Sequence, residues 1–440
     1  MNICLLTFGC QMNRLDSELV RESLTAAGHN VTTGEDNADV ILYNTCSVRD
    51  HAEQRVLSRM QQNVVRKKKH PHLLLGMLGC FAQRMGHLLL DKIPQLDLVI
   101  GTHQFTRIAE WIEQAAAGPV IAVEMCEEIG QGVRDAHARP THNGWQGYVS
   151  IMRGCNNFCS YCIVPYVRGR EVSRTIPSVL DEIRALEDKG VKEVTLLGQN
   201  VDAYGKDINS TLSELLNRVH DSISSIIRIR FVTSHPRDIT ETLIRTVNQL
   251  PKIAKHLHMP AQSGSTEILE RMRRGYTRSE YDEKLKMIHE LSPDMLVASD
   301  FIVGFSGETE SHFAETLDLV KKAKFQNSFI FKYSPRPGTA SASDYADDVP
   351  SAEKAKRNYA LLAAQNEVNL ERGKSLVGAS LRILAEGRST RDASRMIGRT
   401  GTNLICVFDA SPNDDNLIGS EVDVKVVSYS ALTLFCEKVK

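Results

Sequence analysis

The chain has 440 residues, a hydrophobic share of 42% and a charged share of 24%, which exclude a disordered protein and predict roughly two to four folded domains. No stretch of about 18 apolar residues occurs, so we expect no membrane-spanning helix and no membrane partner. The formal net charge of -1 gives no global sign of a nucleic-acid partner. Because no signal-type segment opens the chain, we expect a cytoplasmic protein whose ten cysteines stay reduced.

Residues 1–118 are predicted to form a domain in which short apolar strands alternate with helices. Four apolar runs have the length and composition of buried strands: 2–8, 39–43, 73–78 and 96–100. This alternation is typical of a doubly wound α/β domain, in which helices cover both faces of a parallel sheet. Residues 119–140 lose the periodicity and gain glycines and a proline, so we interpret them as a linker.

Residues 141–372 resume the alternation with a longer period. Six runs are candidate strands: 147–152, 193–198, 228–233, 256–260, 296–305 and 326–333. Helical patterns fill the gaps between them, and a long one covers 352–372. Six βα units predict a partial (βα)6 version of the eight-unit parallel barrel.

Residues 373–439 have the pattern of a separate all-β domain. Short β-type runs lie between Gly, Asn and Asp turns: 381–384, 404–407, 422–426 and 432–435. Such runs predict a small antiparallel β-barrel.

Cys155, Cys159 and Cys162 lie in one loop with the spacing C-x3-C-x2-C. Three thiolates this close can bind three irons of a 4Fe–4S cluster and leave the fourth iron open to a small molecule. The loop follows the first strand of the predicted barrel, and catalytic sites of such barrels lie at the carboxyl ends of the strands. A structural zinc site is the alternative, but it needs four ligands and no fourth Cys or His is close in sequence.

Cys10, Cys46 and Cys80 each follow one of the first three predicted strands. Because the carboxyl ends of parallel strands share one edge of a sheet, these cysteines can converge and bind a second cluster. The alternative is that each is a buried thiol. We prefer that alternative for the remaining cysteines, to which we assign no metal: Cys4, Cys126, Cys406 and Cys436.

The segment 153–171, which contains Cys155, Cys159 and Cys162, resembles the signature of the radical S-adenosylmethionine superfamily, and its flanks resemble the methylthiotransferases. The resemblance implies that S-adenosylmethionine binds the open iron through its amino and carboxylate groups. It also implies that the reduced cluster donates one electron, which gives methionine and a 5′-deoxyadenosyl radical.

The resemblance also implies contacts with S-adenosylmethionine. The implied residues lie in the cysteine loop or at the ends of predicted barrel strands: Tyr161, Gly198, Gln199, Asn200, Ser234 and Gln262. For single residues a purely structural interpretation stays open, because Gly198, for example, can simply allow a turn.

The segments around Cys10, Cys46 and Cys80 resemble the amino-terminal domain of the methylthiotransferases, which holds an auxiliary 4Fe–4S cluster. This resemblance implies two 4Fe–4S clusters per chain. The open iron of the second cluster would carry or help to deliver sulfur, and a second S-adenosylmethionine would supply the methyl group.

Short stretches distinguish the branches of this family. Residues 44–56, 194–205 and 271–278 resemble the branch that acts on tRNA with an isopentenylated adenosine at position 37, although Phe81 and Ala261 stand where Met and Val are expected. The implied reaction is methylthiolation at C2 of N6-isopentenyladenosine. A threonylcarbamoylated adenosine or a ribosomal protein is the alternative substrate. A non-catalytic iron–sulfur protein that binds RNA is the alternative of another class.

The carboxy-terminal barrel resembles the TRAM domain, a small RNA-binding barrel, which implies the tRNA anticodon loop as a partner. Five arginines are concentrated there against Glu386 and Asp392: Arg382, Arg388, Arg391, Arg395 and Arg399. They can form a basic patch for phosphates or simply a solvated face. The expected chemistry also implies an electron donor such as a flavodoxin or ferredoxin, and we expect the chain to be a monomer.

Overall fold

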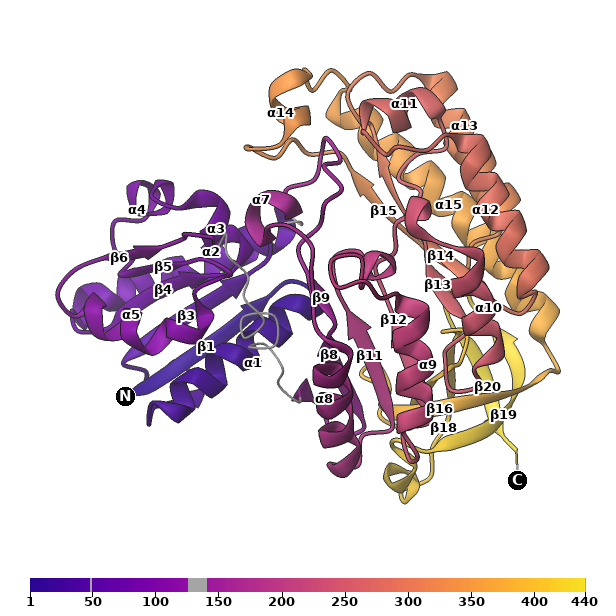
Figure 1. Ribbon diagram of the computed structural model, residues 1–440, viewed down its shortest axis with the longest axis horizontal. Helices are drawn as coiled ribbons and strands as arrows, with labels where there is room; N and C mark the ends of the chain where they lie inside the picture. Colours follow the sequence, from indigo (N-terminus) through magenta and orange to yellow (C-terminus); the bar gives the residue numbers. More distant parts are fainter. Residues whose placement is uncertain (48–49, 126–140, 440) are drawn as a thin grey trace. The chain divides into compact units, whose positions relative to one another are not determined.

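The computed structural model of this protein describes residues 1–47, 50–125 and 141–439 (Figure 1). Contacts within the chain define two compact units. The first unit comprises residues 1–141, 152–158 and 162–172, and the second comprises residues 142–151, 159–161 and 173–440. Among the described residues, no helix is long and apolar enough to cross a membrane.

The first unit contains a six-stranded parallel sheet with the order β2-β1-β3-β4-β5-β6. Its strands are β1 (Asn2–Phe8), β2 (Asn30–Thr32), β3 (Val40–Thr45), β4 (Leu74–Leu78), β5 (Leu98–Ile100) and β6 (Val120–Ala122). The four apolar runs of the sequence form β1, β3, β4 and β5, and β3 is buried along its whole length. The range expected to be a linker begins with β6, and its residues 126–140, with Cys126, lie outside the described part of the chain.

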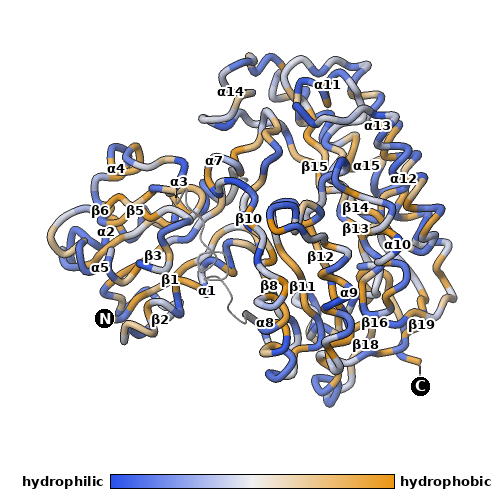
Figure 2. The backbone as a smooth tube through the Cα atoms, in the orientation of Figure 1, coloured by the Kyte–Doolittle hydropathy of each residue, from blue (hydrophilic) through white to orange (hydrophobic). Residues whose placement is uncertain are grey.

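Helices cover both faces of this sheet, which confirms the doubly wound fold. On one face, α1 (Gln11–Ala26) and α5 (Ile108–Ala115) share a core with the strands. On the other face the core includes residues of α2 (Asp50–Lys69), α3 (Cys80–Met85) and α4 (Leu88–Lys92). Hydrophobic residues of the strands lie in both of these cores, and most of β1 has hydrophobic colours in Figure 2. The 3-10 helix η1 (Phe105–Arg107) and the helix α7 (Val164–Arg168) complete the unit.

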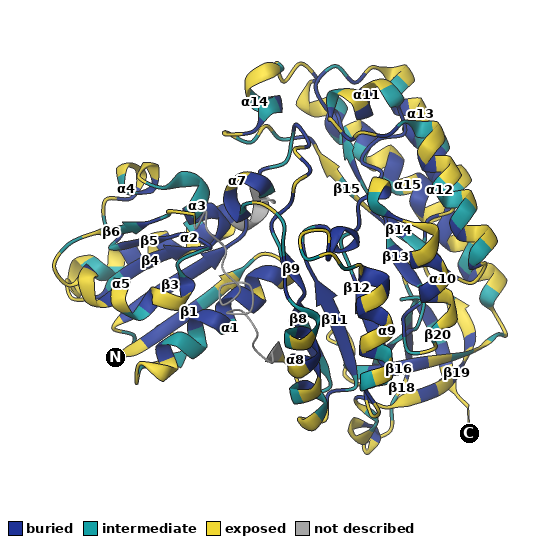
Figure 3. Cartoon of the chain, in the orientation of Figure 1, coloured by how far each residue is buried: buried dark blue, intermediate teal, exposed yellow. Residues whose placement is uncertain are grey.

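The second unit contains six parallel strands in two sheets, which confirms the predicted (βα)6 arrangement. The strands are β8 (Gln146–Ser150), β11 (Glu193–Leu197), β12 (Arg228–Phe231), β13 (His256–His258), β14 (Leu296–Val303) and β15 (Ser328–Lys332). A single bridge, Ile229 with Ile253, connects β12 to the segment before β13. Three two-residue strands lie at or near the boundaries between the units along the chain: β7 (Thr141–His142), β9 (Met152–Arg153), which belongs to the first unit, and β10 (Val172–Ser173). Figure 3 shows that β11 is buried along its length.

Threonines begin five of the helices that connect these strands. The side chains of Thr175, Thr211, Thr240, Thr277 and Thr309 accept a hydrogen bond from a backbone N–H in the first turn. The capped helices are α8 (Ile176–Asp188), α9 (Leu212–Ser222), α10 (Glu241–Gln249), α12 (Arg278–Leu291) and α13 (Glu310–Ala323). The others are α11 (Thr266–Arg271), α14 (Ala340–Asp344), α15 (Ser351–Leu376), η2 (Val201–Ala203) and η3 (Pro236–Asp238). These caps fix where each helix starts, and therefore the length of the loops at the strand ends.

The carboxy-terminal residues form a closed barrel with the order β16-β17-β18-β20-β19. Its elements are β16 (Ser380–Arg388), β17 (Arg395–Thr400), β18 (Ile405–Asp409), η4 (Asp414–Leu417), β19 (Glu421–Tyr429) and β20 (Leu434–Lys438). Cys406 and Cys436 lie in its apolar core. The pairing is antiparallel except between β18 and β20, which are parallel.

Candidate active site

Cys10, Cys46 and Cys80 lie at the carboxyl ends of three neighbouring strands of the first unit. Cys10 directly precedes α1, Cys46 follows β3, and Cys80 is the first residue of α3. The chain leaves β1 for β2 on one side, whereas β3 lies on the other side, so the strand order reverses between β1 and β3. Ligands of open α/β sheets bind at such a reversal.

Two glycines let the three loops approach one another. A Cβ on Gly9 would lie 2.6 Å from the Cβ of Cys46, and φ at Gly9 is +138°. A Cβ on Gly79, where φ is +89°, would lie 2.3 Å from Oδ1 of Asn44. Any side chain at these two positions would push the cysteine loops apart, and glycine also adopts the positive φ without strain.

The positive charge of Arg168 acts on Cys10 and Cys80 in the direction of the thiolate form that binds a metal. A hydrogen bond from the Cys46 thiol lowers the pKa of Cys10 to about 6, and the positive charge of Arg168 acts in the same direction. Burial raises the pKa of Cys80, and Arg168 partly offsets that effect. By contrast, Cys4 lies in the apolar core of the sheet, where burial raises its pKa to about 11. Cys4 thus has the environment of a structural thiol.

Arg168 belongs to a buried ion network that no sequence pattern predicted. Asp16 is fully buried and accepts hydrogen bonds from Arg153 and Arg168, each at 2.6 Å. Two guanidinium groups on one carboxylate leave a net positive charge in the protein interior. That charge lies beside Cys10 and Cys80, where it stabilises negative charge on sulfur.

The loop of Cys155 is fixed by its own backbone. At Gly154, φ is +76° and a Cβ would lie 1.9 Å from the carbonyl oxygen of Arg170, so only glycine fits. The N–H of Cys155 donates to the carbonyl of Gly169 at 3.1 Å. The N–H of Asn157 donates to Sγ of Cys155 at 3.4 Å. Hydrogen bonds to sulfur of this kind are among the features that tune iron–sulfur clusters.

Cys159 lies beside a buried arginine in the second unit. Nη1 of Arg274 donates to Sγ of Cys159 at 3.3 Å and lies 3.4 Å from the hydroxyl of Tyr161. Its Nη2 donates to the carbonyl of Pro260 at 2.9 Å, and its Nε donates to the hydroxyl of Tyr276 at 3.0 Å. The guanidinium group therefore ties Cys159 to the end of β13 and supplies positive charge to the sulfur.

We expect Arg274→Gln to make the reduction potential of the cluster at this loop more negative. Glutamine keeps hydrogen-bond donors but removes a buried positive charge. That positive charge favours the reduced cluster, which is the more negative form, so its loss lowers the reduction potential. Each 1.4 kcal/mol of lost interaction corresponds to about 60 mV for one electron. An electron paramagnetic resonance titration would measure the shift, with Arg274→Lys as the charge-retaining control. An unchanged potential in Arg274→Gln would contradict this role.

Asn200 and Ser234 lie at the carboxyl ends of β11 and β12 in one buried polar group. Nδ2 of Asn200 donates to Asp238 at 2.7 Å, and Oγ of Ser234 donates to Asp202 at 3.1 Å. Burial raises the pKa of Asp202 to about 7. Oδ1 of Asn200, Oδ2 of Asp202 and Nε2 of His235 are buried without a hydrogen-bond partner. Such atoms fit a polar cofactor with hydroxyl and ammonium groups, and the sequence pattern had not indicated Asp202.

The other expected cofactor residues lie at the same strand ends or in the cysteine loop. Gly198 is buried directly after β11, and Gln199 next to it is partly exposed. Tyr161 packs beside a small apolar cluster of the second unit. Gln262 follows β13 and has a φ of +69°, which is rare for a residue with a side chain. Such strained positions are concentrated at functional sites.

The groups around the cysteines suit an iron–sulfur cluster rather than a single metal ion. Within the described residues, no three His, Cys, Asp or Glu side chains converge as ligands of a single metal ion. A 4Fe–4S cluster instead presents a separate iron to each cysteine, so its ligands need not meet at one point. The residues present fit such clusters, because three thiols per loop group, N–H donors and buried guanidinium groups surround the sulfurs.

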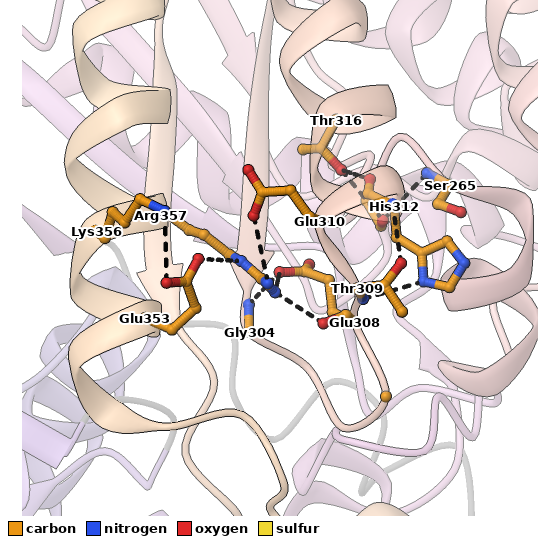
Figure 4. Close-up of polar contacts among 12 residues, drawn as sticks. Ser265, Gly304, Glu308, Thr309, Glu310, His312, Thr316, Glu353, Lys356 and Arg357 are labelled. Atoms are coloured by element: carbon orange, nitrogen blue, oxygen red, sulfur yellow. Dashed lines mark hydrogen bonds and ion pairs between the residues drawn. The ribbon is translucent and has the colours of Figure 1, made fainter.

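A buried ion pair holds the loop after β14 to α15. Nη1 of Arg357 donates to Oε1 of Glu308 at 2.8 Å and to its carbonyl at 2.8 Å, and the N–H of Gly304 donates to the same carboxylate at 2.7 Å (Figure 4). Glu353 and Glu310 lie on the outer side of the guanidinium group. Burial raises the pKa of Glu308 although Arg357 opposes this. The pair thus fixes a loop at the carboxyl end of the partial barrel.

The arginines of the carboxy-terminal barrel do not form a patch of unpaired charge. Four of the five are in ion pairs: Arg382 with Asp423, Arg388 with Asp415, Arg395 with Asp392 and Asp409, and Arg399 with Glu386. The local sequence showed Glu386 and Asp392, but not the partners farther along the chain, Asp409, Asp415 and Asp423. Phosphate groups can still displace such pairs, because exposed ion pairs contribute little.

The partial barrel, with its cysteine loop and its polar strand ends, defines a radical S-adenosylmethionine enzyme. Consistent with this class, the family model described as Radical SAM superfamily matches residues 149–320. The model described as Uncharacterized protein family UPF0004 matches residues 2–101, which carry Cys10, Cys46 and Cys80. This class uses S-adenosylmethionine and a 4Fe–4S cluster.

Curated relatives match almost the whole chain. The tRNA-2-methylthio-N(6)-dimethylallyladenosine synthase of Thermoanaerobacter pseudethanolicus is 40% identical over 99% of this chain and 92% of its own length. The protein of the same name from Moorella thermoacetica is 41% identical over 99% and 98%, and that of Desulfosudis oleivorans is 42% identical over 97% and 94%. The chain therefore belongs to the family of tRNA-2-methylthio-N(6)-dimethylallyladenosine synthases.

Solved structures share the fold at low sequence identity. The radical S-adenosylmethionine methyltransferase TsrM from Kitasatospora setae has a TM-score of 0.56 and 14% identity, over 78% of this chain and 74% of that protein. The cobalamin-dependent S-adenosylmethionine radical enzyme OxsB has a TM-score of 0.51 and 11% identity, over 82% and 56%. At these identities the likeness concerns the fold alone.

Proposed function

We propose that this enzyme transfers a methylthio group to C2 of N6-isopentenyladenosine at position 37 of tRNA. The observation that carries the proposal is that Cys10, Cys46 and Cys80 gather where the strand order of the first unit reverses, while the chain also has the C-x3-C-x2-C loop. Two three-cysteine groups suit a reaction that needs both radical formation and sulfur delivery. The names of the relatives supply the tRNA substrate and its dimethylallyl group.

In this proposal, Cys155, Cys159 and Cys162 hold the cluster that cleaves S-adenosylmethionine. When bound, the cluster and S-adenosylmethionine together supply a radical that can activate C2 of the adenine. The chain's own residues bind and orient the cofactor: Tyr161, Gly198, Gln199, Asn200, Ser234 and Gln262. Arg274 is a positioning residue, since it holds Cys159 against the end of β13.

Cys10, Cys46 and Cys80 would hold the second cluster, whose open iron is available to sulfur. The buried positive charge of Arg168 offsets the charge of the thiolates there. Cys10, whose pKa is lowered, loses its proton more readily than Cys80, whose pKa burial raises.

The proposal also specifies partners. The enzyme acts on the tRNA anticodon loop, whose single-stranded bases can be splayed out and stacked on side chains. It needs an electron donor such as a flavodoxin or ferredoxin, and it works as a monomer. A reducing cytoplasm suits it, because the described cysteines are all free thiols.

The test is nucleoside mass spectrometry of bulk tRNA from a strain that lacks its own methylthiotransferase for isopentenylated adenosine. Expression of this chain should restore the 2-methylthio mark on that base and leave the level of its unmethylthiolated precursor low. If the mark appeared only on threonylcarbamoylated adenosine, or on no tRNA base at all, the proposed function would be wrong.

A further inference from the structure

One face of the sheet of β13, β14 and β15 is covered by helices, among them α12 and α15. Ser299, Phe301 and Ser328 point to the covered face: Ser299 lies 3.5 Å from the hydroxyl of Tyr281 on α12, and Ser328 donates to Gln365 on α15 at 2.6 Å. Because side chains alternate along a strand, the next residues point to the other face. In a parallel barrel that other face looks toward the interior, beneath the carboxyl ends of the strands where active sites lie.

Two phenylalanines are exposed on this inner face. Phe329 and Phe331 on β15 are 50% and 37% exposed, and they pair with Asp300 and Ile302 on β14. From Ser328 to Phe331, exposed residues of β15 alternate with less exposed ones, and Lys332 at the end of the strand is exposed as well. Exposed aromatic surface on the inner face of a barrel offers an apolar area that a bound ligand can cover.

A polar pair borders the phenylalanines on the same face. Nε2 of His258 lies 2.9 Å from Oδ1 of Asp300, and its ring meets the ring of Phe329 edge to face with centroids 6.5 Å apart. The inner face of β14 and β15 thus combines apolar surface with a carboxylate at its edge. It can accept an uncharged apolar group, whereas a group that carries its own carboxylate would be repelled by Asp300.

This surface is continuous with the cofactor residues. The N–H of Gln262 donates to the carbonyl of Asp300 at 2.8 Å, and the N–H of Ile302 donates to the carbonyl of Gln262 at 2.9 Å. The residues next to Phe329 and Phe331 on β14 are therefore bonded through the backbone to a residue proposed to bind S-adenosylmethionine. A group that lay on the phenylalanines would be held within the same site as the cofactor.

We propose that Phe329 and Phe331 receive the dimethylallyl group of the target adenosine and thereby determine which modified base the enzyme accepts. This inference rests on the proposed function and adds the residues that set its specificity. The branched five-carbon group matches an aromatic surface, and the face excludes the carboxylate of a threonylcarbamoyl group through Asp300. Binding of the dimethylallyl group thus also orients C2 of the base.

The test compares three RNA stem-loops of the anticodon arm, with isopentenylated, unmodified or threonylcarbamoylated adenosine, on the anaerobic enzyme with both clusters loaded. Dissociation constants and the rate of methylthio formation give a preference ratio for each variant. Phe329→Ala and Phe331→Ala should each lower the preference for the isopentenylated stem-loop about tenfold, the scale of one lost apolar contact. Phe329→Leu should keep most of the preference, and Tyr359→Ala, an aromatic residue 73% exposed on α15, should keep all of it.

Each outcome bears on the inference. If the alanine variants bound the isopentenylated and the unmodified stem-loops more weakly by the same factor, or kept the wild-type ratio, the inference would be overturned while the proposed function stood. If the wild-type enzyme methylthiolated the threonylcarbamoylated stem-loop instead of the isopentenylated one, the proposed function would fall, and the inference with it.

Discussion

Replacing Cys10 with alanine should abolish methylthiolation of tRNA while S-adenosylmethionine is still cleaved, whereas replacing Cys155 should abolish both. Cys10 lies with Cys46 and Cys80 at the edge of the amino-terminal sheet, and Cys155 lies in the C-x3-C-x2-C loop. If each group holds its own cluster, radical formation depends only on the cluster at Cys155. After anaerobic reconstitution we expect about eight irons in the wild-type protein and about four in each variant. Release of 5′-deoxyadenosine after addition of dithionite then separates the two variants.

Cys4→Ala is the matched control for this experiment. Cys4 lies on the same sheet, but it is fully buried among apolar residues and its pKa is raised to about 11. The Cys4→Ala variant should therefore keep both its irons and its methylthiolation activity. A Cys10→Ala protein that retained about eight irons, or that methylthiolated tRNA normally, would remove the second cluster from the proposed function.

Ligands of parallel sheets bind where the carboxyl ends of the strands meet, and this explains why the positions of the cysteines could be predicted. Six short runs of the middle region, separated by helical patterns, became the six parallel strands of the partial barrel. Once strands are located, the edge at which their carboxyl ends meet follows from the topology. The positions of Cys10, Cys46 and Cys80 could be inferred in that way without a local motif.

Short strands and long-range charge partners could not be predicted in the same way. The strands β2 and β6 have three residues each, too few to show a period. In β17, Arg395 and Arg399 obscured the alternation of buried residues, and the sequence suggested a basic patch instead. Arg168 lies 152 residues from its partner Asp16. Such pairs depend on how distant segments pack, so no spacing along the chain indicates them.

The same difference, between residues that follow strands and residues that depend on long-range packing, applies to the proposed cofactor site. Asn200 and Ser234 could be selected because they follow strands, and the structure places them in one polar group. Arg274, by contrast, lies 115 residues after Cys159, with nothing in its local sequence to separate it from its neighbour Arg273. Arg274 is buried and donates four hydrogen bonds, whereas Arg273 is exposed and pairs with Asp344. Burial, which the sequence does not reveal, distinguishes Arg274 from Arg273.

Replacing Arg357 with alanine should lower the free energy of unfolding by about 3–5 kcal/mol, the usual cost of removing one partner of a buried ion pair. The side chain of Glu308 is 1% exposed and would keep only the backbone N–H of Gly304 as a donor. Without its cation, the buried carboxyl group has a still higher pKa, and a raised carboxyl pKa costs stability above the pKa of the unfolded chain. The deficit should therefore be larger at pH 8 than at pH 5. Urea denaturation of the cluster-loaded protein at the two pH values would measure it.

Lys356→Ala provides the comparison on the same turn of α15. Lys356 is 70% exposed and pairs with Glu353 at 3.6 Å, so its loss should change the free energy of unfolding by less than about 1 kcal/mol. The double variant Glu308→Gln with Arg357→Leu should be less destabilised than Arg357→Ala alone, because no charge is left buried without a partner. If Arg357→Ala and Lys356→Ala were equally stable at pH 8, the pair would not be what holds the loop after β14 to α15, since a buried charge cannot lose its counter-ion without cost.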